Sequence, residues 1–532
     1  MVNLAVGLGI YGYLILAFGL AGMLYKIPIF IISLPFIIYF FYKLRKGLHF
    51  NYLNWKKEIK KDKLIGFLAI ILGIQIIINF LGAISPELSF DALWYHLPAA
   101  KMYAENHRIF YIPGWLMWPA NLTRLTEMYY TVALMFGSEI WAKLIHFSFG
   151  ILSAIALFNL LKKYFSLKIC MLGLTTFYTM LIVGWQSTTA YVDLSRTFFE
   201  ILALDLFLQW FDTRKDSFLW ESAVLLGLTI STKIMAFSSL TAYVLLLFWL
   251  LKKEKLKKTI IFVLVCFLIV SPWLIFSFIH TGNPLFPLFG NFKNAFSPAI
   301  SINGLPWFIT NLSQLVILPW KATLLPDDII SPVYLIFLPL VLLTIWKQKM
   351  EFKITGLYLI LGLIFSPLNS NRYLLPYLPA ATLVVLSVFN LEYFKAKRWQ
   401  RLFITIILLG VFANLGSRIL ATKKFVPYLT GKENKSEFLS RNLNFAYGDF
   451  YDVDNWFANN IQKGDLVLIY DIHNLYYVNF PFVHESWAKP GTFFTHILVG
   501  DNKPLPEKFA KHLLIYHNEK TRVSVYVFGE KL

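Results

Sequence analysis

The sequence contains few charged residues and few cysteines. Charged residues make up only 15% of its 532 residues, whereas an ordinary soluble domain has about a quarter. The two cysteines, Cys170 and Cys266, both lie within apolar runs and supply neither a disulfide framework nor a metal cluster. These shortages exclude a soluble enzyme, a disordered scaffold and a disulfide-stabilised secreted module.

Apolar side chains are abundant instead. Hydrophobic residues make up 57% and aromatic residues 18% of the chain, and the mean hydropathy is +0.59. A helix needs about 20 apolar residues to cross the hydrocarbon core of a membrane. Suitable runs lie at 4–25, 28–42, 64–84, 139–161, 168–186, 190–211, 218–233, 237–251, 259–279, 328–346, 354–368, 372–391 and 402–420. The sequence therefore predicts an all-α polytopic membrane protein with about thirteen transmembrane helices.

The formal net charge of +19 is concentrated in the connectors between these runs. Short basic connectors lie at 43–63, 162–168, 252–258, 347–353 and 394–401, with 212–217 on the same side. Counting alternate crossings places all of them together, and the positive-inside rule identifies that side as the cytoplasm. The N-terminus is then cytoplasmic, and no nucleic-acid partner is needed to explain the basic excess. The first run has no basic n-region and no cleavage site, so we expect an anchor.

The outer side receives two long segments, 85–138 and 280–327, and the chain after 421. The first segment is rich in Trp and Tyr, and its stretches 91–106 and 123–137 have the spacing of short interfacial helices. β-rich runs at 465–470, 512–516 and 523–528 predict a small extracytoplasmic α/β domain. We expect three parts: a two-helix hairpin with a basic connector at 1–63, a transmembrane catalytic module at 64–420, and the α/β domain at 421–532.

Asp91 is the first candidate for chemistry, because a carboxylate beside a span is costly unless it is used or paired. It follows the 64–84 run in Ser89-Phe-Asp-Ala-Leu-Trp-Tyr-His96-Leu-Pro, where it could accept a proton from an incoming hydroxyl. On a helix, Tyr95 would share a face with Asp91 and line the same wall. The simpler alternatives are an N-cap role for Asp91 and, for His96, a hydrogen bond to a carbonyl in the membrane interface.

Two further acids lie on the predicted outer side. Asp193 lies three residues before Arg196, and it either pairs with that residue or forms a second acidic wall of the same cavity. Glu127 lies three residues after Arg124, and an ion pair on a solvated helix face is the simpler interpretation there.

Lys233 and Arg372 lie at outer ends of spans, where the positive-inside rule disfavours basic residues. Each therefore needs a partner. A lipid phosphate would suit both, because Arg matches phosphate oxygens bidentately and Lys supplies a point charge. The alternative is that both side chains snorkel to the membrane surface.

Taken in order along the chain, these residues resemble the GT-C superfamily of membrane glycosyltransferases. More narrowly, they are similar to its protein-mannosyltransferase and aminoarabinose-transferase branch. The motifs are Asp91, Tyr95-His96-x-Pro98, Pro119 with Glu127, Tyr191-Val-Asp193, Thr232-Lys233, Ser271-Pro-Trp273, Thr281-Gly-Asn-Pro284 and Arg372-Tyr-x-x-Pro376. The match covers roughly residues 64–420, and it is looser over the first two spans and the C-terminal segment.

The resemblance implies a polyprenyl-phosphate sugar donor, used at the outer face of the membrane. In similar enzymes the aspartate of the first outer loop is the general base that deprotonates the acceptor hydroxyl, and Asp91 takes that place. The sugar is transferred in one displacement with inversion, and basic side chains stabilise the leaving polyprenyl phosphate. The residues for that task are Arg372, Lys233 and Arg124. The residues for the acceptor pocket are Tyr95, His96, Asp193 and Glu127, of which Glu127 and Asp193 could instead hold a divalent ion.

The acceptor is a glycan, a lipid or a protein, and Ala92 bears on the choice. It stands where protein mannosyltransferases have the second acid of an Asp-Glu pair, which argues against a protein Ser/Thr acceptor. Two rival functions are a transporter or lipid flippase and a non-catalytic cell-envelope assembly protein. The sequence has no internal repeats of the transporter kind, and its candidate charges gather at outer span ends. Since the sequence ends without a eukaryotic retention signal, we expect a prokaryotic plasma (inner) membrane.

Overall fold

The structure is a computed structural model that describes the chain except for residues 48–51, 287–329 and 367–369. Within the described residues, seven helical stretches are long and apolar enough to cross a membrane. They are α1 (Val2–Leu20), α2 (Lys26–Gly47), α4 (Lys63–Ala83), α7 (Glu139–Leu161), α13 (Lys255–Thr281), the stretch Arg372–Asn390 around α18 (Leu378–Leu386), and α19 (Lys397–Thr422). The chain is therefore a multi-pass membrane protein, as its composition predicts.

The remaining predicted runs also contain helices, but these are shorter or more polar. They are α8 (Leu167–Tyr178), α9 (Leu181–Gln186), α10 (Asp193–Thr213), α11 (Asp216–Thr232), α12 (Phe237–Leu250), α16 (Pro332–Thr344) and α17 (Met350–Phe365). The 12 residues of α8 extend only about 18 Å at the rise of an α-helix, well short of the hydrocarbon core. The predicted count of thirteen spans is not confirmed for this reason.

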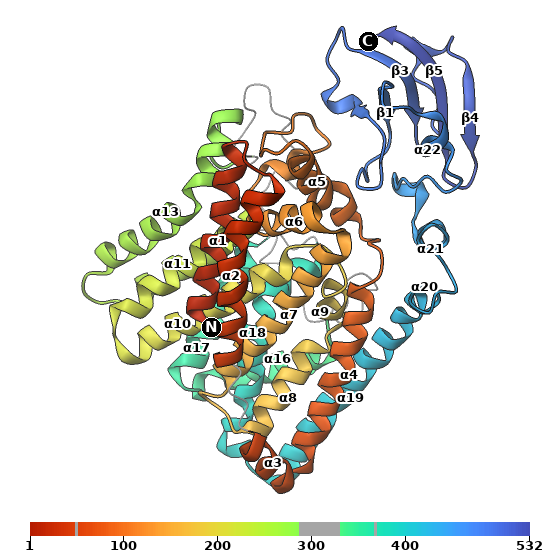
Figure 1. Ribbon diagram of the computed structural model, residues 1–532. Coiled ribbons are helices and arrows are strands. Elements are labelled where there is room, and N and C mark those ends of the chain that lie inside the picture. The colour runs from red at the N-terminus through yellow and green to blue at the C-terminus, as the bar shows by residue number, and fades with distance from the viewer. Residues whose placement is uncertain (48–51, 287–329, 367–369) are drawn as a thin grey trace.

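The helices form one bundle, from which the C-terminal sheet projects at one end (Figure 1). α10 lies at the centre and packs on α7 and α11, and most of its residues are buried. α19 packs along α4 and runs from the end near α3 (Tyr52–Lys61) toward α20 (Val426–Leu429) and α21 (Lys435–Asn442). The sheet and α3 therefore lie at opposite ends of the molecule.

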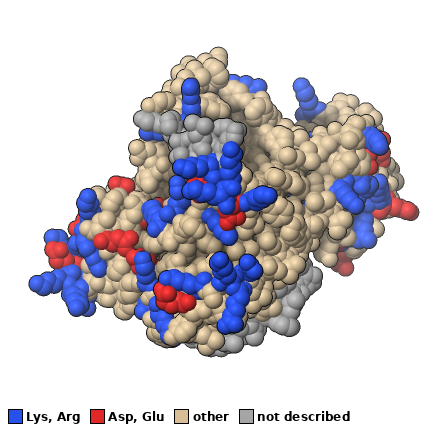
Figure 2. Space-filling model, turned by 90° about the horizontal axis from the view of Figure 1, so that it is seen from below, with Lys and Arg blue, Asp and Glu red and all other residues tan. Residues whose placement is uncertain are grey.

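Basic side chains gather at the end that lies away from the sheet. Figure 2 views this face, where clusters of Lys and Arg stand out on a largely uncharged surface and Asp and Glu are fewer. Such a one-sided distribution is what the positive-inside rule associates with a cytoplasmic face.

Residues 85–138, predicted as the first outer segment, contain the predicted helices, but Arg124 and Glu127 among them are buried. It folds as η1 (Ala92–His96), α5 (Leu97–Glu105), η2 (Trp118–Asn121) and α6 (Leu125–Phe136). α6 packs among α1, α5 and α7, which buries both Arg124 and Glu127. The interpretation of these two residues as a solvated ion pair is therefore wrong. Most of the second predicted outer segment, 280–327, lies outside the described residues.

The C-terminal segment contains the predicted sheet. Its five strands are β1 (Val467–Tyr470), β2 (Phe482–His484), β3 (Phe493–Val499), β4 (Leu514–Asn518) and β5 (Val523–Lys531), in the order β2-β1-β3-β5-β4. β1 pairs in parallel with β2 and β3, whereas β5 is antiparallel to β3 and β4. The short helix α22 (Trp456–Asn460) precedes the strands. We call these strands, with α20 to α22 and their connecting loops, the outer domain.

The outer domain contains a buried histidine that makes its stability depend on pH. Burial, followed by the charge of His473, lowers the pKa of His484 to about 3. The backbone N–H of Ser486 donates to Nδ1 of His484 at 3.1 Å, so this nitrogen must be unprotonated. Because the unfolded pKa is about 6.5, the stability from neutral His484 is complete above that pH and is lost as the pH falls toward 3.

We therefore expect the outer domain to become easier to cleave by protease as the pH is lowered from 7 to 5. A His484→Asn variant should lose most of this dependence, since an amide oxygen accepts the same hydrogen bond at every pH. Proteolysis of the purified protein, followed by mass spectrometry of the first fragments, measures both effects. An identical pH profile in the variant would show that another group is responsible.

Candidate active site

Four charged residues meet where several helices begin or end. Asp91 precedes η1, Asp193 is the first residue of α10, Lys233 ends α11, and Arg372 lies in η5 (Asn371–Tyr377). Each lies where a helix starts or stops: Lys233 has an extended backbone (φ −153°, ψ 119°), and the Ser370 hydroxyl caps the amide of Arg372 at 3.2 Å. Local chain breaks thus bring charges from four elements together.

The four side chains form a continuous row of alternating charge. Nη1 of Arg372 lies 2.7 Å from Oδ2 of Asp91, and its Nε lies 3.7 Å from Oδ2 of Asp193. Nζ of Lys233 lies 2.6 Å from Oδ1 of Asp193. The charges of the row balance, which is how ionised groups are tolerated away from bulk water. Lys233 and Arg372 each contact a carboxylate, whereas the lipid phosphate expected from the sequence stays a prediction.

Tyrosines surround the row and fix the orientation of Asp91. The hydroxyl of Tyr95 donates to Oδ2 of Asp91 at 3.0 Å, and the amide of Asp91 donates to the hydroxyl of Tyr191 at 3.1 Å. Burial, with the nearby Asp91 carboxylate, raises the pKa of Tyr95, so its hydroxyl stays protonated and donates. The Arg372 guanidinium lies over the rings of Tyr191 and Tyr373, with 4.9 and 5.2 Å to the ring centroids. These cation–π contacts hold the guanidinium beside Asp91.

Three of the four charges remain accessible. The side chains of Asp91, Arg372 and Lys233 are 15%, 11% and 12% exposed, whereas that of Asp193 is 1% exposed. Nε of Arg372 and Oδ2 of Asp193 are buried and have no hydrogen-bond partner in the described part of the chain. The arrangement therefore offers an accessible carboxylate as a proton acceptor and, directly beside it, two cations with donor capacity left for an anion.

Several simpler sequence interpretations of these residues are wrong. Asp91 occupies an N-cap position, but its side chain makes no capping hydrogen bond. Asp193 pairs with Lys233 and not with Arg196, whose guanidinium lies 3.7 Å from Glu200. Local i,i+3 spacing failed here because partners from other helices are closer.

His96 and Glu127 form a separate pair next to the row. Nδ1 of His96 lies 2.7 Å from Oε1 of Glu127, and both side chains are buried. The His96 ring also lies 4.2 Å from the ring of Tyr95, centroid to centroid. The interpretation of His96 as a residue bonded to a carbonyl is thus wrong. Glu127 contacts His96 while Asp193 contacts cations, and the described residues contain no group of three or more potential metal ligands. This donor set does not fit a divalent ion held by Glu127 and Asp193.

Arg124 lies apart from the row. Its guanidinium donates to the Tyr103 hydroxyl and lies over the rings of Trp273 and Phe276, 5.6 and 5.2 Å from their centroids. Its Nε and Nη2 are buried without a partner among the described residues, and burial lowers its pKa to about 10. The structure therefore places Arg124 in an aromatic cage and not beside Arg372.

The sequence interpretation missed Glu87. This buried carboxylate accepts backbone N–H groups from Leu88 at 2.9 Å, Ser89 at 2.8 Å and Ala190 at 2.6 Å. It thereby joins the loop that leads to Asp91 with the turn that leads to Asp193. The available signal was an acid directly after the 64–84 span, the same signal that identified Asp91.

The chain shares its fold with known proteins, but its sequence matches none of the families or curated proteins with which it was compared. No protein-family model matches the chain, and no curated protein matches its sequence. Among solved structures, ArnT from Cupriavidus metallidurans bound to undecaprenyl phosphate has a TM-score of 0.57 and 13% identity, over 87% of this chain and 98% of that chain. The apo state of the same ArnT has a TM-score of 0.55 and 13% identity, over 87% and 97%. The chain is therefore similar in fold to ArnT, an aminoarabinose transferase of the GT-C superfamily, as the order of its motifs predicts.

Proposed function

We propose that the protein is a membrane glycosyltransferase. It transfers a sugar from a polyprenyl-phosphate donor to a hydroxyl of an acceptor at the outer face of the membrane. The observation that carries the proposal is the accessible Asp91 carboxylate, held 2.7 Å from Arg372 within a row that ends in Lys233. The ArnT fold supports it, because that protein has been solved with undecaprenyl phosphate bound.

In the proposed reaction the acceptor oxygen forms a bond to the anomeric carbon while the bond from that carbon to the phosphate oxygen breaks. Asp91 takes the proton of the acceptor hydroxyl, and the electron pair of the broken bond leaves on the polyprenyl phosphate. Attack opposite the leaving group inverts the anomeric carbon. Tyr95 donates to Asp91 and holds it in place, and His96, Glu127 and Asp193 complete the wall of the acceptor pocket.

The developing charge on the phosphate is stabilised by Arg372 and Lys233, since preorganised cations act where negative charge grows. Both already contact carboxylates, so the phosphate binds to the donor positions that remain, among them Nε of Arg372, which has no hydrogen-bond partner among the described residues. Arg124 is the third proposed phosphate-binding residue. Its support is a pair of buried guanidinium nitrogens that have no hydrogen-bond partner in the described part of the chain, a costly arrangement that an anion would relieve.

Replacement of Lys233 by methionine should weaken donor binding. The change keeps the length of the side chain and removes the charge, which should raise the KM for the lipid donor about tenfold, as loss of one charge-assisted hydrogen bond does. Asp193 keeps Arg372 as a neighbour, so folding should be retained. Initial rates over a range of donor concentrations measure the effect, with Lys432→Met, an exposed lysine of the outer domain, as the matched control. An unchanged KM for the donor would show that Lys233 does not bind the donor phosphate.

We further propose an orientation in a prokaryotic plasma membrane. The N-terminus and the basic face are cytoplasmic, and the row of charges and the outer domain are extracytoplasmic. The basic end of the molecule and the sheet lie at opposite ends, which supports this placement (Figures 1 and 2). The proposed division into 1–63, 64–420 and 421–532 assigns the transfer reaction to the middle part.

The experiment that tests the function compares cells with the gene, cells without it and cells that carry the Asp91→Asn variant. Mass spectrometry of their glycans, lipids and proteins should find an acceptor that is one sugar lighter without active protein, together with accumulated lipid-linked sugar. A flippase would change the sidedness of the donor without a mass change that depends on Asp91. An assembly protein would leave every mass unchanged in the variant.

A further inference from the structure

The outer domain contacts the loop that carries Asp91 through a short segment between β1 and β2. We call residues 474–479 the outer-domain loop. The amide of Tyr476 donates to the carbonyl oxygen of Leu93 at 3.2 Å, and the hydroxyl of Tyr477 donates to the carbonyl oxygen of Glu87 at 2.9 Å. Glu87 and Leu93 lie on either side of Asp91. Hydrogen bonds from the outer domain therefore fix the backbone on both sides of the proposed base.

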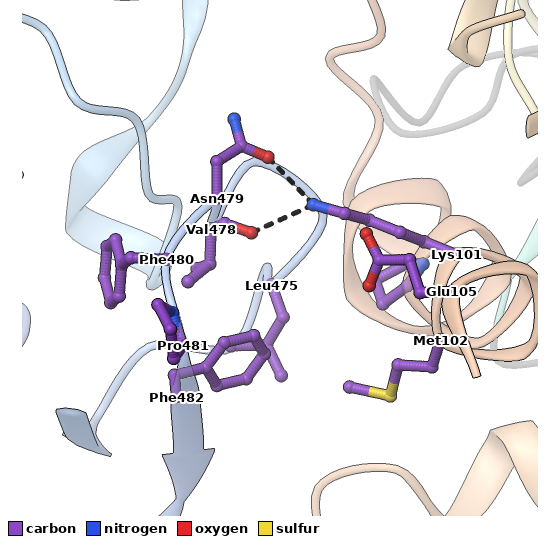
Figure 3. A pocket seen from close by; sticks show the side chains of 10 residues that line it. Lys101, Met102, Glu105, Leu475, Val478, Asn479, Phe480, Pro481 and Phe482 are labelled. Carbon is purple, nitrogen blue, oxygen red and sulfur yellow. Dashed lines mark hydrogen bonds between the residues drawn. The ribbon is translucent and has the colours of Figure 1, made fainter. Parts of the chain in front are cut away.

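Lys101 provides a second connection, from the middle of α5. Its ammonium group donates to the carbonyl oxygens of Tyr476 at 3.2 Å and Val478 at 2.9 Å, and to Oδ1 of Asn479 at 2.8 Å. Figure 3 shows the side chain reaching across a cavity of about 350 Å³ to the outer-domain loop. An ammonium group has three N–H donors, and all three of those on Lys101 donate to this loop.

The outer domain is also anchored farther from Asp91. Nζ of Lys435 lies 2.5 Å from Oε1 of Glu139, the first residue of α7, and the hydroxyl of Tyr476 donates to Oε2 of the same carboxylate at 3.2 Å. This buried carboxylate fixes where the outer-domain loop sits on the helical bundle. Because the outer-domain loop is itself held on the helical bundle, its contacts to Glu87, Leu93 and Lys101 restrain the position of the loop that carries Asp91.

Glu87 connects the outer-domain loop with the segments that carry the charged row. Its carbonyl oxygen binds Tyr477, and its carboxylate binds the amides of Ser89 and Ala190. Ala190 lies next to Tyr191, whose hydroxyl accepts the amide of Asp91. A displacement of the outer-domain loop would thus reach Asp91 through Glu87 and also through Leu93.

We propose that the outer domain completes the active site by clamping the Asp91 loop, and that Tyr477 and Lys101 are positioning residues for Asp91. The inference rests on the proposed function, because it concerns the residue assigned as the base. The physical reason is that Asp91 lies in the first turn of its helical segment, directly before the π-helical turn η1, where few hydrogen bonds within the helix hold the backbone. A general base must be held within a fraction of an ångström of its working position, and here tertiary contacts must supply the restraint.

The test uses the full-length protein with Tyr477→Phe and Lys101→Met. The first variant removes one hydroxyl, and the second removes three hydrogen bonds while keeping the length of the side chain. In both, amide hydrogen exchange in residues 87–97 should become faster than in the wild type, while exchange in β3 and β5 stays unchanged. The kcat for transfer should fall about fivefold in Tyr477→Phe and about tenfold in Lys101→Met, with the donor KM unchanged. Tyr447→Phe and Lys511→Met, at exposed positions of the outer domain, are the matched controls.

The outcomes separate this inference from the proposed function. Hydrogen exchange is measured without substrate, so unchanged exchange in residues 87–97 overturns the clamp even where Asp91→Asn abolishes transfer. Faster exchange with an unchanged kcat overturns the positioning role. Full transfer by Asp91→Asn overturns the assignment of Asp91 as the base, and the role of Tyr477 and Lys101 in positioning that base falls with it.

Discussion

Replacement of Asp91 by asparagine should abolish sugar transfer while the protein still inserts, folds and binds its donor. Asparagine has the size of aspartate and can accept the hydrogen bond from Tyr95, but it cannot take a proton from the acceptor hydroxyl. Loss of general base catalysis lowers rates by about 10²–10⁴-fold. The variant also releases Arg372 from its 2.7 Å ion pair. The freed guanidinium remains available to the donor phosphate, so donor affinity should be retained.

The measurement is single-turnover transfer with a saturating lipid-linked donor, combined with donor binding in the same detergent. Glu105→Gln, the same chemical change at an exposed residue of α5, is the control and should transfer at the wild-type rate. An Asp91→Glu variant should keep more activity than Asp91→Asn, because it restores a carboxylate one methylene group out of place. Full activity in Asp91→Asn would mean that another group takes the proton.

Replacement of Arg372 by glutamine should also nearly eliminate transfer, by a different route. Arg372 contacts the proposed base, approaches Asp193 and lies over two tyrosine rings, so its replacement removes all of these contacts at once. Its loss removes a positive charge from the leaving phosphate, and removal of one such preorganised donor costs about 10²–10³-fold in rate. It also leaves Asp91 without its cation. We therefore expect the donor KM to rise and kcat to fall.

The lysine variant shows which property of Arg372 matters. Arg372→Lys keeps the charge but loses the planar group that contacts two acids and stacks on Tyr191 and Tyr373, so its activity should lie well below the wild type and above that of Arg372→Gln. Arg108→Gln, at an exposed arginine of the same outer segment, is the matched control. Equal rates in Arg372→Lys and the wild type would mean that charge alone is sufficient. Wild-type activity in Arg372→Gln would exclude Arg372 from the transition state.

The two variants should not have additive effects. Asp91 and Arg372 are in contact, so removal of either leaves the other altered, and contacting residues commonly show large coupling energies. The double variant should be little slower than Asp91→Asn alone. Independent, multiplying losses would indicate that the two residues serve separate steps.

Much of the molecule follows from local sequence patterns. Apolar runs identified the segments that contain α1, α2, α4, α7 to α13 and α16 to α19, whereas α3, α5 and α6 lie outside those runs. The β-rich runs identified β1, β4 and β5. The number of membrane crossings could not be predicted from these patterns. Hydropathy reports how apolar a segment is, and a helix buried inside the bundle is as apolar as one that contacts lipid. α8 and α12 are examples of helices that are apolar but too short to count among the seven.

For the candidate site, too, the sequence predicted one part and missed another. Each of the eight residues was recognisable alone, as a charge or polar group in an apolar setting, but their pairing was not. Local spacing assigned Asp193 to Arg196 and Glu127 to Arg124, whereas the structure pairs Asp193 with Lys233 and Glu127 with His96. Arg124 met the same sequence criterion as Arg372 and yet lies in an aromatic cage.

The sequence by itself thus determined that this is a membrane protein, where its helices lie and which charges require an explanation, because these depend on composition and periodicity along the chain. Only the tertiary structure decided that Asp91, Arg372, Asp193 and Lys233 form one row, and that Tyr477 and Lys101 hold the loop beside it. Contacts between residues so distant in the chain depend on how the ends of α10, α11, η1 and η5 pack in space. No periodicity in the sequence carries that information.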